Sequence, residues 1–178
     1  MTIKPLFVCI IFLLATPLFS QEMMTTKDGA PIPATETWDF LCENYALTGT
    51  AKVQIAKDGK GGVLKIAVQT TDPSFFIGGV AYVYLEDNTI IVCTDKRMRT
   101  NKDNVSTVWY TFSTVEMNKL KTTNIGSIRF SIRGNPTKFS SQTGTFTAVN
   151  KKSYFSVGEN KPETYPTATQ ITALYHKP

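Results

Sequence analysis

Histidine is almost absent from this 178-residue chain, and its scarcity excludes the commonest kinds of hydrolytic site. The only histidine, His176, stands two residues before the last one. Nucleophilic catalysis by serine or cysteine usually needs a histidine base held against the nucleophile, and a side chain at a chain end is not held rigidly. The sequence therefore argues against a Ser-His-Asp enzyme and against a Cys-His enzyme.

Cysteine is scarce as well, with Cys9, Cys42 and Cys93 as the only three. Zinc sites need a cluster of cysteine and histidine ligands, so we expect no metal site. No loop has the frame of a phosphate-binding motif, and we expect no cofactor. For Cys42 and Cys93 two alternatives stay open. They form a disulfide, which would close a loop of about fifty residues and stabilise the fold by ~3–4 kcal/mol, or they are separate buried thiols.

Dense runs of one charge are missing too. The formal net charge is +5, but the 19 basic residues are interspersed with 14 acidic ones. A nucleic-acid-binding surface needs a denser basic tract. We therefore expect no nucleic-acid partner, and we interpret the mild positive charge as an aid to solubility or to weak attraction by acidic surface polymers.

A long apolar run occurs once, near the start of the chain. Leu6–Leu14 is uninterrupted by polar residues, Lys4 precedes it, and Pro17 and the small residue Ser20 follow. This is the order of a secretory signal peptide, and the run is too short for a permanent membrane anchor. We expect residues 1–20 to be removed and the mature protein to be exported, to the periplasm or the extracellular space, without a transmembrane anchor.

The remainder of the chain divides into a short polar segment and one domain. Residues 21–35 contain Gly29, Pro31 and Pro33 among polar residues, a composition that predicts a flexible leader. Residues 36–178 are enough for a single domain with its own core.

Apolar and polar residues alternate through most of this domain, which is the period of a half-buried strand. Turn residues at 57–62 and at 87–88 separate pairs of such segments and predict two hairpins. The spacing predicts a mostly-β fold, a single antiparallel β-sandwich, with a β-barrel as the alternative. The predicted strands are 51–55, 64–68, 80–85, 89–94, 107–112, 128–133, 144–149 and 153–157.

Two of these strands, 80–85 and 89–94, are apolar on both faces. Such strands are typical of the covered centre of a sheet, so we expect them to lie centrally and under cover. The charged segment 95–104 that follows is expected to be a loop.

Two short helices are also expected. Ser113 and Glu116 have the spacing of a capping box, which predicts a helix over 114–121. Pro166 suits a first helical turn, and apolar residues follow at helical spacing, which predicts a C-terminal helix within 165–175.

The best candidate binding residues lie on two strands. Trp109 is out of phase with the apolar side of its strand, between Thr107 and Thr111, and Arg129 and Arg133 are on the polar side of theirs. If the strands share a face, the indole could stack a sugar ring or a peptide aromatic while arginine holds a carboxylate. The alternative is that Trp109 is covered and belongs to the core, as large aromatics more often do.

Tyr82 and Tyr84 share one face of their strand. Their rings could line a groove, or they could cover the sheet while their hydroxyls reach water.

Paired carboxylates offer the remaining catalytic possibility. A glycosidase needs two carboxyl groups roughly 5–10 Å apart across a groove. The candidates are Asp39, Glu43, Asp72, Glu86 and Asp87.

Two segments resemble a known group of proteins. The leader that ends in Leu-Phe-Ser-Gln-Glu is similar to those of secreted Bacteroidetes proteins. The segment from Tyr110 to Arg133 resembles a strand–short helix–strand unit of small uncharacterised secreted β-domain proteins of that phylum. The resemblance implies an envelope or extracellular β domain, and it transfers no functional residue.

Three functions are compatible with these observations. The first is a non-catalytic exported module that binds a glycan or an envelope protein. The second is a carboxylate-based hydrolase of polysaccharide or peptidoglycan. The third is a β-barrel that holds a small apolar ligand.

Overall fold

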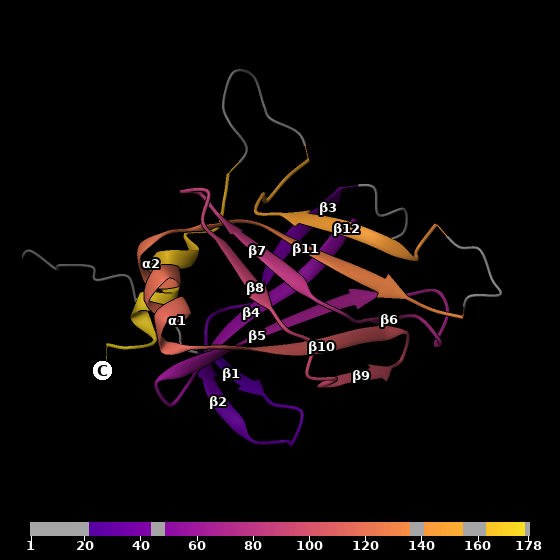
Figure 1. Cartoon of the computed structure of the whole chain (residues 1–178), viewed down its shortest axis with the longest axis horizontal. Coiled ribbons are helices and arrows are strands. Elements are labelled where there is room, and N and C mark those ends of the chain that lie inside the picture. The colour runs from indigo at the N-terminus through magenta and orange to yellow at the C-terminus, as the bar shows by residue number, and fades with distance from the viewer. Residues whose placement is uncertain (1–21, 44–48, 136–140, 155–162, 177–178) are drawn as a thin grey trace, which may run out of the picture.

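The computed structural model describes residues 22–43, 49–135, 141–154 and 163–176. The predicted signal peptide and most of the strand predicted at 153–157 lie outside these ranges. Within them, twelve strands and two helices follow one another along the chain (Figure 1). They are β1 (Glu22–Thr25), β2 (Pro31–Ala34), β3 (Trp38–Glu43), β4 (Thr50–Asp58), β5 (Gly61–Gln69), β6 (Phe76–Ile77), β7 (Ala81–Leu85), β8 (Ile90–Cys93), β9 (Arg99–Lys102), β10 (Val105–Phe112), α1 (Thr114–Thr122), β11 (Ile125–Arg133), β12 (Gly144–Val149) and α2 (Thr167–Ala173).

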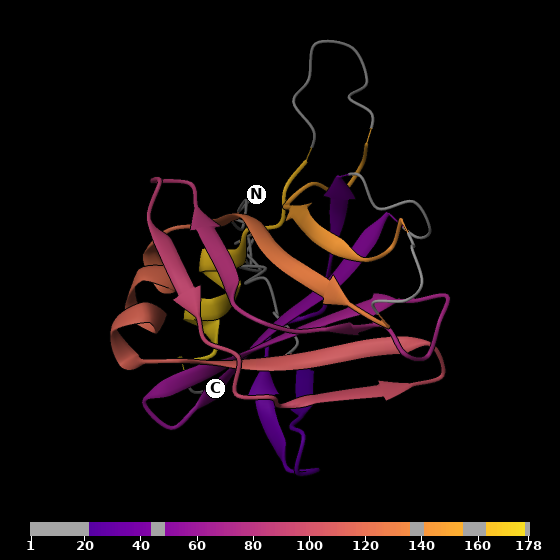
Figure 2. The same cartoon turned by 45° about the vertical axis from the view of Figure 1, so that its right-hand side comes forward.

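All strands of the described residues belong to one antiparallel sheet. Its main path runs β8-β7-β11-β12-β3-β4-β5-β10-β9, with β1, β2 and β6 attached at its sides. The sheet curls into a half-barrel, so that its two ends face each other across the core as the layers of a sandwich do (Figures 1 and 2). The predicted mostly-β antiparallel fold with short helices is confirmed.

The alternation along each strand decides which side chains enter the half-barrel. On β11, Ile128, Phe130 and Ile132 are buried, whereas Arg129, between the first two, and Arg133, which follows the third, are exposed. The inward side chains of the other main strands join one continuous core with those of β11. Because these side chains fill the interior, the fold offers no support for a small apolar ligand inside the barrel.

The two helices close one end of the half-barrel (Figure 2). The capping box that starts α1 is present as predicted: Ser113 Oγ accepts a bond from Glu116 N, and Glu116 Oε2 accepts one from Ser113 N at 2.6 Å. The C-terminal helix is also present as α2, where Gln170 Oε1 accepts a bond of 2.8 Å from Trp38 Nε1. Of the residues described, no helix has both the length and the apolar character to cross a membrane.

The segment predicted to be a flexible leader is ordered over most of its length. β1 and β2 pair with each other, and Ala34 continues the pairing to Ala56 of β4. The prediction was wrong because proline and glycine were interpreted as marks of a loop. A strand that is paired along only a small part of one side, as β2 is with β4, tolerates proline. Met24 and Ala34 are buried, together with Trp109 of β10, in a second cluster outside the main core.

The strands and the turn of the second predicted hairpin are present as β7 and β8. The prediction that both strands lie at the centre of the sheet was wrong. β8 lies at one end of the sheet and not at its centre, and β7 is next to it. The outward-facing side chains Val80, Tyr82, Ile90 and Val92 are exposed. The segment 95–104 is likewise not only a loop, since β9 within it pairs with β10.

Candidate functional site

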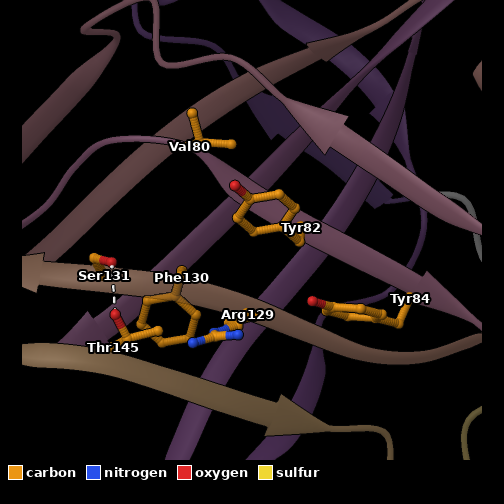
Figure 3. Close-up of a pocket in the computed structure, with 7 residues that line it drawn as sticks. All are labelled: Val80, Tyr82, Tyr84, Arg129, Phe130, Ser131 and Thr145. Atoms are coloured by element: carbon orange, nitrogen blue, oxygen red, sulfur yellow. Dashed lines mark hydrogen bonds between the residues drawn. The ribbon is translucent and has the colours of Figure 1, made fainter.

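The outer face of β7, β11 and β12 carries a groove of about 240 Å³. Its floor is the sheet itself, and the side chains that stand on it come from all three strands (Figure 3). The lining residues are Val80, Tyr82, Tyr84, Arg129, Phe130, Ser131 and Thr145.

The register of the sheet explains why these residues meet. Tyr82 of β7 is directly opposite Arg129 of β11, and Arg129 is in turn opposite Thr147 of β12. The same row continues to Val92 of β8 on one side and to Glu43 of β3 on the other. Side chains directly opposite one another on one face are about 5 Å apart at Cβ, so the row crosses five strands as a continuous strip.

Arg129 stands at the centre of this groove. In Figure 3 it lies between the two tyrosines of β7 and the hydroxyl pair formed by Ser131 and Thr145. The two hydroxyl oxygens are 3.2 Å apart. Arg129 is exposed, and among the described residues no carboxylate forms an ion pair with it. Its guanidinium is thus a cation with donors available to an incoming anion.

The two tyrosines provide the aromatic part of the groove. Tyr82 and Tyr84 project from the same face of β7, with Tyr82 more exposed. A tyrosine ring offers a flat apolar surface for stacking together with a hydroxyl that can form hydrogen bonds. The groove therefore combines aromatic surface, hydroxyl groups and one cation that has no acidic partner in the described part of the chain. This set of groups is suited to an acidic, hydroxylated ligand.

Trp109 is not part of this groove. It points outward from β10, as its phase predicts, but it is only 6% exposed because Met24, Ala34 and Met98 pack around it. Thr107 and Thr111 flank it on the same outer face. The predicted platform of Trp109 with the two arginines therefore does not exist, because β10 and β11 lie in opposite parts of the curled sheet and β1–β2 covers the indole.

Arg133 shares the outer face of β11 with Arg129 but has a different environment. Its guanidinium lies against Gly79, and its positive charge acts on Asp95. Burial alone would raise the pKa of Asp95, but hydrogen bonds from the N–H groups of Gly79 and Arg97 and the charges of Arg99 and Arg133 outweigh it, so the pKa lies below its ordinary value. Arg133 is thus partly engaged within the protein.

The candidate carboxylates do not converge. Asp39 and Glu43 lie four residues apart on β3, which corresponds to about 13 Å along a strand, beyond the separation that glycosidases use. Glu86 and Asp87 form the tip of the β7–β8 hairpin, and Asp72 lies in a separate turn, where its Oδ1 accepts a bond from Ser74 N. The geometry that a two-carboxylate hydrolase requires is absent from these five residues.

The two cysteines are free, buried thiols. Of the two alternatives, the structure therefore has separate thiols and no disulfide between them. Cys42 on β3 and Cys93 on β8 are separated in the sheet by the three strands β7, β11 and β12, so they are not neighbours on adjacent strands. Burial raises the pKa of each thiol to about 12. No group of cysteine, histidine and acidic side chains in the described part of the chain could hold a metal ion.

The sequence indicated part of the groove but not its composition. Arg129, Tyr82 and Tyr84 were recognisable from their phase, whereas Val80, Ser131 and Thr145 carried no signal of their own. Only the pairing of β7 with β11 and of β11 with β12 brings these residues together. No protein family, curated protein or solved structure matches this chain.

Proposed function

We propose that this protein is an exported, non-catalytic binding module that holds a carboxylate-bearing glycan in the groove of β7, β11 and β12. The single observation that carries the proposal is the exposed Arg129, which lacks an acidic partner among the described residues and stands between tyrosine rings and hydroxyl groups. The predicted leader supports the exported location, where polysaccharides of the cell envelope are accessible.

Each part of the groove has a counterpart in an acidic sugar. The face of Tyr82 or Tyr84 can stack against the apolar C–H face of a pyranose ring. Arg129 can donate two parallel hydrogen bonds to a carboxylate. The hydroxyls of Ser131 and Thr145 can exchange bonds with sugar hydroxyls. Because the groove lies on the outer face of the sheet, a segment of a polymer can be bound in it.

Binding of an oligogalacturonate by isothermal titration calorimetry tests this proposal. Arg129→Gln should weaken binding about 10- to 100-fold, because a hydrogen bond to a charged group is worth roughly 1.5–3 kcal/mol. Tyr82→Ala should also weaken binding. Fully methyl-esterified oligogalacturonate, which lacks the negative charges, should bind to the native protein as weakly as the acidic form binds to Arg129→Gln.

Lys60→Gln is the matched control, since it removes one exposed positive charge at the β4–β5 turn, away from the groove. It should leave the affinity within about twofold. Equal losses in Lys60→Gln and Arg129→Gln would show a non-specific charge effect. Equal affinity for the acidic and esterified oligomers would contradict a carboxylate site.

A further inference from the structure

β8 is an end strand of the sheet with an open edge. Its ladder within the described residues is to β7 alone, and Figure 2 shows the β7–β8 hairpin as an outer part of the curled sheet. Natural proteins usually protect such an edge with charges, proline or a bulge. The segment from Thr89 to Thr94, Thr-Ile-Ile-Val-Cys-Thr, contains neither charge nor proline.

The backbone groups that face this open edge belong to Ile90 and Val92. Leu85 N donates to Thr89 O at 2.9 Å, so Leu85 and Thr89 form a hydrogen-bonded pair at the hairpin end. Hydrogen-bonded and non-hydrogen-bonded pairs alternate along an antiparallel ladder. Ile91 and Cys93 therefore bond to β7, whereas the N–H and C=O groups of Ile90 and Val92 point away from it.

The side chains of the same two residues are exposed on the outer face. Ile90 is 50% exposed and Val92 is 54% exposed. Tyr84 and Tyr82 are their neighbours across the ladder on β7. The open edge thus has unpaired backbone groups and an apolar surface in one place.

The two ends of β8 carry opposite charges. Glu86 and Asp87 are exposed in the turn before the strand, and Lys96 and Arg97 are exposed after it. When two copies of such a strand pair in antiparallel orientation, the acidic end of each lies next to the basic end of the other. This complementarity favours a second copy of the same chain over an unrelated strand.

We propose that two copies of this protein associate through their β8 strands, paired antiparallel about a two-fold axis at Ile91. In this register Ile90 of one copy lies opposite Val92 of the other, so the backbone groups that point outward form hydrogen bonds with each other. The antiparallel orientation also brings the acidic turn before β8 of one copy, with Glu86, toward the basic segment after β8 of its partner, with Lys96. The two sheets become continuous, and the two outer faces lie on the same side because the two-fold axis is perpendicular to the sheet.

Amide hydrogen exchange of the native protein at several concentrations tests the pairing directly. In the single copy the amides of Ile90 and Val92 exchange fast, and those of Ile91 and Cys93 exchange slowly because they bond to β7. The first two should slow as the concentration rises, in parallel with a doubling of mass in sedimentation equilibrium. Absence of association at concentrations up to about millimolar would overturn the proposal. A Kd in that range corresponds to a binding free energy of only about 4 kcal/mol.

Two substitutions locate the interface. Val92→Lys and Ile90→Lys each place a charge on the edge and should abolish the dimer. Val115→Lys changes another exposed valine, on α1 and 66% exposed, and should retain it. Circular dichroism confirms that each variant is folded. A dimer that persists in both folded edge variants would exclude this interface.

Charge reversal tests the register and the identity of the partner. Glu86→Lys and Lys96→Glu should each shift the dimerisation equilibrium toward monomer. The double variant should recover the native dimer, because both contacts are then reversed together. Failure of the double variant to recover dimerisation would contradict the proposed antiparallel register.

Discussion

Trp109 lies on the outer face of β10 and is nevertheless buried. Its phase along the strand places the indole opposite the main core, but β1 and β2 lie over it and form a second small core around it. The indole N–H has no hydrogen-bond partner among the described residues. At the scale of the single residue, Trp109 therefore acts as a packing residue whose ring, and not its polar group, contributes to stability.

Substitution of Trp109 separates these two contributions. Trp109→Ala should lower the free energy of unfolding by about 3–5 kcal/mol, because it removes a large buried ring and leaves a cavity. Trp109→Phe should cost only about 1–2 kcal/mol, since the ring is largely kept and the N–H that is lost has no partner. Urea unfolding followed by circular dichroism measures both. An alanine variant as stable as the native protein would show that the indole is not packed.

The β1–β2 hairpin buries part of the outer face of β10. It pairs with the sheet through β4, and its buried residues Met24 and Ala34 contact the Trp109 cluster. Among the described residues, no corresponding element covers the outer face of β7 and β8, where Val80, Tyr82, Ile90 and Val92 are exposed. The two ends of the curled sheet thus differ in exposure, because an additional hairpin covers one of the two outer faces.

Two adjacent methionines test whether this hairpin is folded onto the sheet. Met24 is 1% exposed and Met23 is 58% exposed. Met24→Ala should lower the free energy of unfolding by about 2–3 kcal/mol, whereas Met23→Ala should change it by less than about 0.5 kcal/mol. Chemical denaturation of the two variants measures these changes. Equal changes in the free energy of unfolding would indicate that residues 22–34 do not pack on the domain.

At the scale of the whole molecule, the half-barrel is closed on one side by a polar corner. Tyr110 of β10 donates to the carbonyl of Gly79 at 3.0 Å, and Asp95 accepts from Gly79 N at 2.8 Å and from Arg99 Nη2 at 2.9 Å. Ile77 N of β6 donates to Ser106 Oγ of β10. These bonds join the segment between β6 and β7 to β10, which belongs to the opposite end of the sheet.

The lowered pKa of Asp95 makes this corner sensitive to acid. A carboxylate whose pKa is lower in the folded state stabilises the fold above its unfolded pKa, about 3.9, and this contribution is lost as the pH falls through the folded value. Asp95→Asn should be less stable than the native protein at neutral pH, and the difference should shrink below about pH 4. Urea unfolding over this pH range measures the effect.

Asp39→Asn is the control for this pH dependence. The Asp39 carboxylate is 52% exposed and its distance to Lys52 Nζ is 3.8 Å, and such a surface ion pair contributes little. Its substitution should leave the pH dependence close to that of the native protein. The native protein and Asp95→Asn could instead differ in free energy of unfolding by the same amount at every pH. That result would show that the carboxylate charge does not stabilise the corner.

Pairing of two molecules through β8 would have a consequence for binding. Both grooves would lie on the same side of one continuous sheet, at distances set by rigid strands. A repetitive polymer that occupies both sites is held more tightly than by either site alone. The proposed dimer and the proposed glycan site would then act together, although each is tested by a separate experiment.

The local features of this protein can be predicted from its amino-acid sequence. Alternation of apolar and polar residues placed Ile128, Phe130 and Ile132 inward and Arg129 outward, and the capping box placed the start of α1, because these properties depend on neighbours in the chain. Which outward faces are covered depends on the packing of segments that are distant in the chain. Strand order and sheet curvature arise from pairing between distant segments, so the burial of Trp109, the separation of Cys42 from Cys93 and the open edge at β8 are not visible in any local pattern.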